Sequence, residues 1–217
     1  MTGSRPAAPA ISPRFLGLLS EEELGDRRAL DLGCGWGRLT LALAPRAHRV
    51  IGLDRDRALV ADARGRAAAA GVDNVEFHEA DVEREEYGGW APALITAHLC
   101  ASAAIVERAG RALELGGCLG MVAFHVDQWR ETGKVSRFAY DAARMEGLLR
   151  RAGFQPEVIE VEREVKRFAS VEEGLAAAVG LEDRWRADGR WHRYLGFLEA
   201  GGRTLTRSHL IVKARRS

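Results

Sequence analysis

The fold is decided by residues 29–43, which read ALDLGCGWGRLTLAL. A short apolar run breaks at three alternating glycines and then continues as an apolar segment of helical length. This order is typical of the strand, glycine loop and helix that open a nucleotide-binding α/β unit. The glycines allow a tight turn that a ligand can approach closely. The first turn of the helix offers that ligand free N–H groups and a positive dipole end.

The spacing of the glycines separates two classes of nucleotide-binding protein. A dinucleotide fingerprint, G-x-G-x-x-G, would have its last glycine at position 38, where this chain has Arg38. The third glycine is Gly37 instead, and the order D-x-G-x-G-x-G over residues 31–37 resembles motif I of the class I methyltransferases that use S-adenosylmethionine. The resemblance extends over most of the chain.

The resemblance implies an α/β fold of the Rossmann-like, doubly wound type. It implies a seven-stranded sheet in the order 3-2-1-4-5-7-6, with strand 7 antiparallel and helices on both faces. Apolar and alternating runs in the chain predict matching strands at residues 29–32, 48–54, 75–80, 93–99, 118–124, 157–163 and 210–214. Helices are predicted at residues 14–24, 57–70, 102–115 and 137–152, and directly after the glycine loop.

We expect a single methyltransferase domain over residues 1–217, with a flexible tail at residues 1–12. About forty residues, 165–205, separate the last two strands, and a connection of that length usually has a function or its own structure. Its helix-forming start predicts a helical cap inserted between strands 6 and 7. The segment is rich in aromatic residues, namely Trp185, Trp191, Tyr194 and Phe197. They would line a substrate pocket or, alternatively, pack against the domain or a second copy.

Acidic residues follow the second and third predicted strands. Asp54 lies about 20 residues after the glycine loop, where an acid accepts hydrogen bonds from the ribose hydroxyls in nucleotide folds. A helix cap is the alternative role, although Asp56 is better placed for it. The resemblance implies that Asp81 bonds the adenine amino group and that the N–H of Val82 meets the ring. The alternative for Asp81 is a solvated loop position.

The glycine loop would hold the methionyl part of the cofactor against its backbone, and Asp31 would attract the ammonium group, directly or through water. The complete set of cofactor-binding residues that the resemblance implies is Asp31, Gly33, Cys34, Gly35, Gly37, Asp54, Arg55, Asp81, Val82 and Ala97.

Methyl transfer from a sulfonium needs mainly the alignment of acceptor, methyl carbon and sulfur, so a catalytic dyad is not required. His98 follows the fourth predicted strand and His125 the fifth, and an imidazole can accept a proton near neutral pH. We take His98 as the candidate catalytic base; a rim or packing histidine is the alternative for both. Asp127 and Trp129 are expected either to line the pocket or to belong to a surface loop. Trp36 packs under the first helix or touches the ligand.

Several absences narrow the function. The formal net charge is +1, which provides no global field for nucleic acid. Residues 96–99 read TAHL and lack the Asn/Asp-Pro-Pro-aromatic motif of enzymes that methylate base amines, and Cys100 has no preceding proline. The three cysteines form no CxxC pair, and neither the acid near the end of strand four nor the later Asp-Asn pair of metal-dependent catechol enzymes is visible, so we expect no disulfide, zinc or divalent metal. Without a signal peptide or membrane-length apolar run, a soluble, cytoplasmic protein is expected.

The sequence thus predicts an S-adenosylmethionine-dependent methyltransferase that acts on a small molecule by in-line displacement and releases S-adenosylhomocysteine. It is similar to the small-molecule branch that includes quinone- and biotin-pathway enzymes. No nucleic-acid partner and no membrane are expected, and the oligomeric state is left open. The alternatives are an RNA or protein methyltransferase on the same core, and a non-catalytic module that binds S-adenosylmethionine or another nucleotide.

Overall fold

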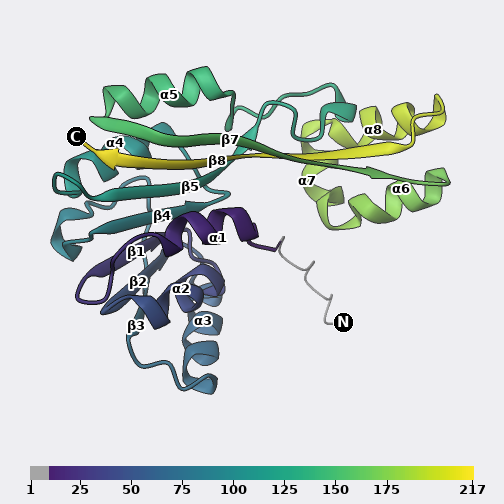
Figure 1. The fold of residues 1–217 in the computed structure, drawn as a ribbon. Helices are drawn as coiled ribbons and strands as arrows, with labels where there is room; N and C mark the ends of the chain where they lie inside the picture. The colour runs from purple at the N-terminus through teal and green to yellow at the C-terminus, as the bar shows by residue number, and fades with distance from the viewer. Residues whose placement is uncertain (1–9) are drawn as a thin grey trace. The chain divides into compact units, whose positions relative to one another are not determined.

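The structure is a computed structural model, and the residues that it describes are 10–217. Its described residues divide into two compact units (Figure 1). The larger, here called the core unit, contains residues 11–123, 140–160 and 210–217. The smaller, here called the inserted unit, contains residues 124–139 and 161–209. Most of the tail expected at residues 1–12 lies outside the described residues; within it, Ser12 caps the first helix by accepting a hydrogen bond from the N–H of Phe15.

The sheet has the strand order β3-β2-β1-β4-β5-β8-β7, with a short eighth strand, β6, beside β5. Strands β1 to β5 pair in parallel. β8 runs against both neighbours, because Arg216 at its end bonds Gly117 before β5 and Ser217 bonds Gly153 before β7. The strands are β1 (Arg28–Leu32), β2 (Arg49–Asp54), β3 (Val75–Glu79), β4 (Leu94–His98), β5 (Cys118–His125), β6 (Ala139–Tyr140), β7 (Phe154–Arg167) and β8 (Thr204–Arg216).

The predicted fold class, strand order and antiparallel last strand are confirmed, with β7 and β8 as the predicted strands 6 and 7. The number of strands was wrong, because β6 forms within the helix predicted at residues 137–152. That helix begins only after Asp141, whose extended backbone and side chain cap it by accepting from the N–H of Arg144. Phe138 is consequently 44% exposed instead of packing on the helix's apolar side.

Helices cover both faces of the core-unit sheet, as the alternation of buried side chains requires. Leu30 and Leu32 of β1 pack with α4 and α5, whereas Ala29 packs with α1 and α2 on the other face. The helices of this unit are α1 (Pro13–Ser20), α2 (Arg38–Leu43), α3 (Arg57–Ala69), α4 (Ala103–Ala112) and α5 (Ala142–Arg151), with short 3-10 turns at Ala44–Arg46 and Gly88–Trp90.

The inserted unit has its own aromatic core. Its helices are α6 (Val171–Ala178), α7 (Glu182–Asp188) and α8 (Arg190–Glu199), with 3-10 turns at Arg130–Thr132 and Val179–Leu181. The ring of Trp185 lies edge-on to Trp129, with centroids 5.3 Å apart, and to Tyr194, at 5.5 Å. Because Trp185 and Tyr194 are fully buried, these aromatic rings hold the unit together and do not line an open surface.

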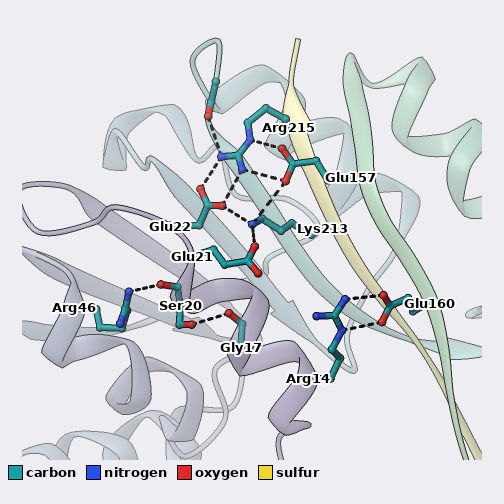
Figure 2. Close-up of polar contacts among 11 residues, drawn as sticks. Arg14, Gly17, Ser20, Glu21, Glu22, Arg46, Glu157, Glu160, Lys213 and Arg215 are labelled. Carbon is teal, nitrogen blue, oxygen red and sulfur yellow. Dashed lines mark hydrogen bonds and ion pairs between the residues drawn. The ribbon is translucent and has the colours of Figure 1, made fainter.

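A network of ion pairs ties the segment after α1 to the last strand (Figure 2). Arg215 donates two hydrogen bonds to Glu22, at 2.6 and 2.8 Å, and further bonds to Glu157. Lys213 lies between Glu21 and Glu22 at 2.7 and 2.8 Å, with its side chain 5% exposed. Burial opposes ionisation of Glu22, but the bonds from Arg215 and Lys213 outweigh it and lower the pKa of Glu22 to about 2.

Glu22→Gln is expected to lower the free energy of unfolding by about 2–4 kcal/mol at pH 7, because it removes the carboxylate that Arg215 and Lys213 share. The folded pKa of Glu22 lies below its ordinary value of 4.5, so this stabilisation is present above pH 4.5 and is lost as the pH falls towards 2. Urea unfolding at pH 7 and pH 3 measures both effects. The exposed Glu23→Gln is the matched control, and an equal loss in the two variants would contradict the prediction.

Candidate functional site

The ends of three parallel strands of the core unit meet at one edge of the sheet. In the pairing register, Leu32 lies beside Leu53 on one side and beside Ala97 on the other. The residues that follow, the glycine loop after β1, Asp54 ending β2 and His98 ending β4, therefore share that edge. In open α/β sheets, ligands bind outside the carboxyl ends of the strands, so this edge is the candidate site.

The glycine loop has backbone φ angles that residues with a side chain rarely adopt. Gly33, Gly35 and Gly37 have φ values of 64°, 54° and 78°. A Cβ atom on Gly37 would lie 2.7 Å from the ring of Phe77, whereas one on Gly35 would meet no atom within 4 Å. Gly37 is thus needed for packing, and Gly35 leaves an open cradle in which a ligand can approach the backbone.

Asp54 faces this loop with its carboxylate already oriented. Its Oδ2 accepts a hydrogen bond from the N–H of Gly35 at 2.8 Å, and its Oδ1 accepts one from the N–H of Asp56 at 2.9 Å. Asp56 itself caps α3 by accepting from the N–H groups of Ala58 and Leu59. The cap role therefore belongs to Asp56, and each oxygen of Asp54 keeps lone pairs for a further donor, an arrangement that fits a ribose diol.

Three further members of the expected cofactor-binding set are wholly or partly exposed. Arg55 and Asp81 are exposed and Val82 is half-buried. The Oδ1 atom of Asp81 accepts from the N–H of Glu83 at 3.0 Å, which forms a local turn. Asp81 thus has a structural role in its own loop, and a hydrogen bond to a ligand would use its remaining acceptor sites.

Cys34 and Ala97, two of the buried members of the expected set, offer a ligand little beyond their backbone. Cys34 packs with Val60, Ala63 and Phe77, and burial raises the pKa of its thiol well above the ordinary range, so the thiol is inert. Ala97 is fully buried in the core next to β1, so its side chain cannot reach a ligand and only its backbone is available.

Asp31 lies beneath the loop and is 1% exposed. Its Oδ2 accepts from the hydroxyl of Thr40 at 2.6 Å and its Oδ1 from the hydroxyl of Thr96 at 3.0 Å. Burial raises the pKa of Asp31 to about 6, against these two hydrogen bonds, which lower it. Sequence reasoning missed both threonines, although the position of Thr40 three residues after Gly37 was a visible signal.

A pH dependence of stability follows from Asp31. Its folded pKa of about 6 lies above its ordinary value of 3.8, so its contribution to stability is greatest below pH 3.8 and is lost as the pH rises towards 6. We expect the free energy of unfolding to fall by about 1–3 kcal/mol over this range. In Asp31→Asn, this pH dependence is expected to disappear. Urea unfolding between pH 4 and pH 7.5 measures this slope. A slope unchanged in Asp31→Asn would assign it to other groups.

His98 lies at the end of β4 on the face that α1 covers. The ring of Phe15 from α1 has its centroid 6.3 Å from the imidazole. The next residue, Leu99, has φ +62°, a strained value for a side chain of this size, and its N–H donates to Val122 at 2.7 Å. Neither Phe15 nor Leu99 was a sequence candidate, because the contact and the backbone angle depend on the folded chain.

The other candidates have partners of their own. His125, Asp127 and Trp129 belong to the inserted unit, where the Nδ1 atom of His125 lies 3.0 Å from the hydroxyl of the buried Ser208. His125 is therefore a partnered packing histidine in that unit. The ring of Trp36 lies under the guanidinium of Arg66, 5.3 Å from the ring centre.

Comparison with known proteins relates part of the chain to a described family. Residues 29–117 match the family described as Methyltransferase domain. A 23S rRNA (uracil(1939)-C(5))-methyltransferase RlmD from Methylococcus capsulatus is 48% identical over 67 residues, which are 30% of this chain and 15% of that protein. A second, from Aeromonas salmonicida, is 43% identical over the same length. The chain thus spans about 15% of the length of these curated relatives.

Solved structures match much more of the chain. The YcgJ protein from Bacillus subtilis has a TM-score of 0.70 at 16% identity, covering 94% of this chain and 98% of that one. An S-adenosylmethionine-dependent methyltransferase from Mesorhizobium loti has a TM-score of 0.60 at 20% identity, covering 94% and 96%. The [4+2]-cyclase SpnF has a TM-score of 0.65 at 25% identity, covering 94% and 80%. Such distant likenesses show the fold.

The fold is Rossmann-like, and the candidate site lies at the carboxyl ends of its parallel strands. Residues 29–117 match the methyltransferase-domain family, in agreement with the resemblance of residues 31–37 to motif I of the class I methyltransferases. Within residues 10–217, no group of three or more His, Cys, Asp or Glu side chains is arranged to hold a metal ion. In the same described residues, no helix combines the length and apolar character that crossing a bilayer requires.

Proposed function

We propose that the protein transfers a methyl group from S-adenosylmethionine to a small-molecule acceptor. The observation that carries the proposal is the pairing of the open cradle at Gly35 with the oriented carboxylate of Asp54. Asp54 would hold the ribose hydroxyls, with Arg55 beside it, and the backbone of Gly33, Cys34 and Gly35 would hold the methionyl part.

The bound cofactor supplies the electrophilic methyl group, so the chain has to bind, orient and exclude water. In this proposal, Asp81 and Val82 meet the adenine from the end of β3. His98 holds or accepts the proton of the acceptor at its imidazole, a group suited to general-base catalysis. The half-buried position of His98, packed against Phe15, supports this role because it limits the ring's freedom.

Binding of S-adenosylhomocysteine tests the proposal without a known acceptor. A ligand that binds the folded state at 100 times its Kd stabilises that state by about 2.7 kcal/mol, so a clear rise in melting temperature is expected. NAD and NADP should give none. A shift with the dinucleotides and none with S-adenosylhomocysteine would overturn the proposal and favour another nucleotide-binding module.

An RNA methyltransferase is the second candidate, because the curated relatives with high local identity are named as rRNA enzymes. The near-neutral net charge favours a small acceptor instead. A salt titration of binding to structured RNA separates the two. Affinity that falls steeply with salt would favour the RNA enzyme, and the absence of binding at 50 mM salt would favour the small molecule.

We also propose that acceptor specificity depends on residues 165–205. This segment supplies α6, α7 and α8 and most of the inserted unit's buried core, to which Trp129 also belongs, and this separate core supports a role of its own. Replacing Val165–Leu205 with a short glycine-containing turn is expected to retain S-adenosylhomocysteine binding and abolish methyl transfer. Light scattering and product release separate this role from that of a dimer interface. If the wild type is a dimer and the variant is a monomer that still transfers the methyl group, the segment is an interface.

A further inference from the structure

The carboxylate of Asp31 is bonded on both sides by residues of other elements. Thr40 of α2 donates its hydroxyl to Oδ2 at 2.6 Å, and Thr96 of β4 donates its hydroxyl to Oδ1 at 3.0 Å. Both threonines are fully buried. Neither hydroxyl faces the candidate site, so the bonds have no direct part in holding a ligand.

These bonds connect the two parts of the site. Asp31 precedes the glycine loop and Thr40 follows it, so the first bond closes the loop between its two ends. The parallel register places Thr96 directly beside Asp31, and His98 follows two residues later on the same strand face. One carboxylate therefore links the segment that would hold the cofactor to the strand that carries the candidate base.

We propose that Thr40 and Thr96 are positioning residues that act through Asp31. Together they keep the glycine loop and the end of β4 in register, so that the N–H of Gly35 stays directed at Asp54 and His98 keeps its place beside the cofactor edge. In this arrangement Asp31 works from inside the protein and makes no direct contact with the cofactor's ammonium group. The inference rests on the proposed function for its link to the cofactor.

The physical basis is the cost of a buried carboxylate. A hydroxyl that bonds a charged acceptor in the interior contributes more than one in water, and removing it leaves the acceptor unsatisfied. Burial raises the pKa of Asp31 to about 6 although both hydroxyls and the backbone of Thr40 bond the carboxylate, so loss of a hydroxyl would disfavour the ionised form further. With one donor gone, the carboxylate would seek another partner, and the nearest movable backbone is the glycine loop.

The test compares Thr40→Val and Thr96→Val, which keep the shape and remove the hydroxyl, with Thr40→Ser and Thr96→Ser, which keep the hydroxyl. Calorimetry is expected to show S-adenosylhomocysteine binding about 5–30-fold weaker in the valine variants and within about threefold of the wild type in the serine variants. Thr132→Val removes another buried hydroxyl, which donates to Trp129 in the inserted unit, and should leave affinity unchanged.

Amide hydrogen exchange supplies a readout that needs no cofactor. In Thr40→Val, exchange at residues 33–37 is expected to accelerate at least tenfold, with Gly35 most affected, while amides of α4 and α5 keep their rates. Uniform acceleration throughout the core unit would mean a purely structural role and overturn the inference. Affinities within twofold of the wild type in both valine variants would do the same.

Two further outcomes are distinguishable. If the wild type itself does not bind S-adenosylhomocysteine, the proposed function fails, and the exchange data alone decide whether the threonines hold the loop. If a valine variant does not fold, Asp31→Asn replaces it, because it keeps both threonines but weakens their bonds. Local acceleration at residues 33–37 then supports the positioning role, and unchanged local exchange overturns it.

Discussion

Asp54→Ala is expected to weaken binding of S-adenosylhomocysteine about 100-fold or more. The variant removes two hydrogen bonds from ribose hydroxyls to a charged acceptor, each contributing about 1.5–3 kcal/mol. It also removes the acceptor of the N–H groups of Gly35 and Asp56, so the loop loses its orientation at the same time. A 100-fold change corresponds to about 2.8 kcal/mol, which isothermal titration calorimetry resolves easily.

The matched control for this variant is Asp62→Ala. Asp62 is an exposed carboxylate on α3 of the same unit, so its removal changes the net charge equally but leaves the loop untouched. We expect affinity in the control to stay within twofold of the wild type. Affinity retained in Asp54→Ala would remove Asp54 from the site, and an equal loss in both variants would assign the effect to overall charge.

His98→Gln is expected to lower the turnover of an acceptor about 100-fold or more, because a positioned general base contributes about 10²–10⁴-fold. Binding of S-adenosylhomocysteine should stay nearly unchanged, since the imidazole would act on the acceptor and not on the cofactor. The measurement is the rate of S-adenosylhomocysteine release with an acceptor found by screening. The expected pattern is a fall in kcat with little change in the cofactor's KM.

His48→Gln is the control, because His48 is exposed and lies at the start of β2, away from the candidate edge. Turnover within a fewfold of the wild type in His98→Gln would show that alignment alone drives the reaction. His98 would then be a residue of the rim whose packing against Phe15 serves the fold.

The features that sequence reasoning predicted well are those that local patterns determine. Three alternating glycines after an apolar run can adopt positive φ values where other residues are strained, which fixes the loop and the start of α2. Apolar runs that end in an acidic residue or a histidine predicted both the strands and the polar residues at their carboxyl ends. Because parallel strands align these ends, Asp54 and His98 were placed at one edge without knowledge of any contact.

The features that it missed depend on packing between distant residues. The bond from Thr96 to Asp31 joins residues 65 positions apart, and only the register of β1 and β4 brings them together. At residues 137–141, helical periodicity continued through Phe138, but the capping by Asp141 decided where α5 begins. The aromatic residues of the inserted unit were visible, yet whether they face a ligand or one another is set by the three-dimensional arrangement.

The position of β8 between β5 and β7 has a consequence for the protein's synthesis. The apolar strand β5 pairs with β4 on one side as soon as both have emerged, but its other edge has no long partner until β8 emerges about 80–90 residues later. At about 5–20 residues per second, the ribosome exposes that edge for on the order of 5–20 s. During this interval the nascent chain presents an unpaired apolar strand, the kind of surface on which aggregation begins. The half-made protein is therefore expected to need chaperone protection in the cell more than the finished one does.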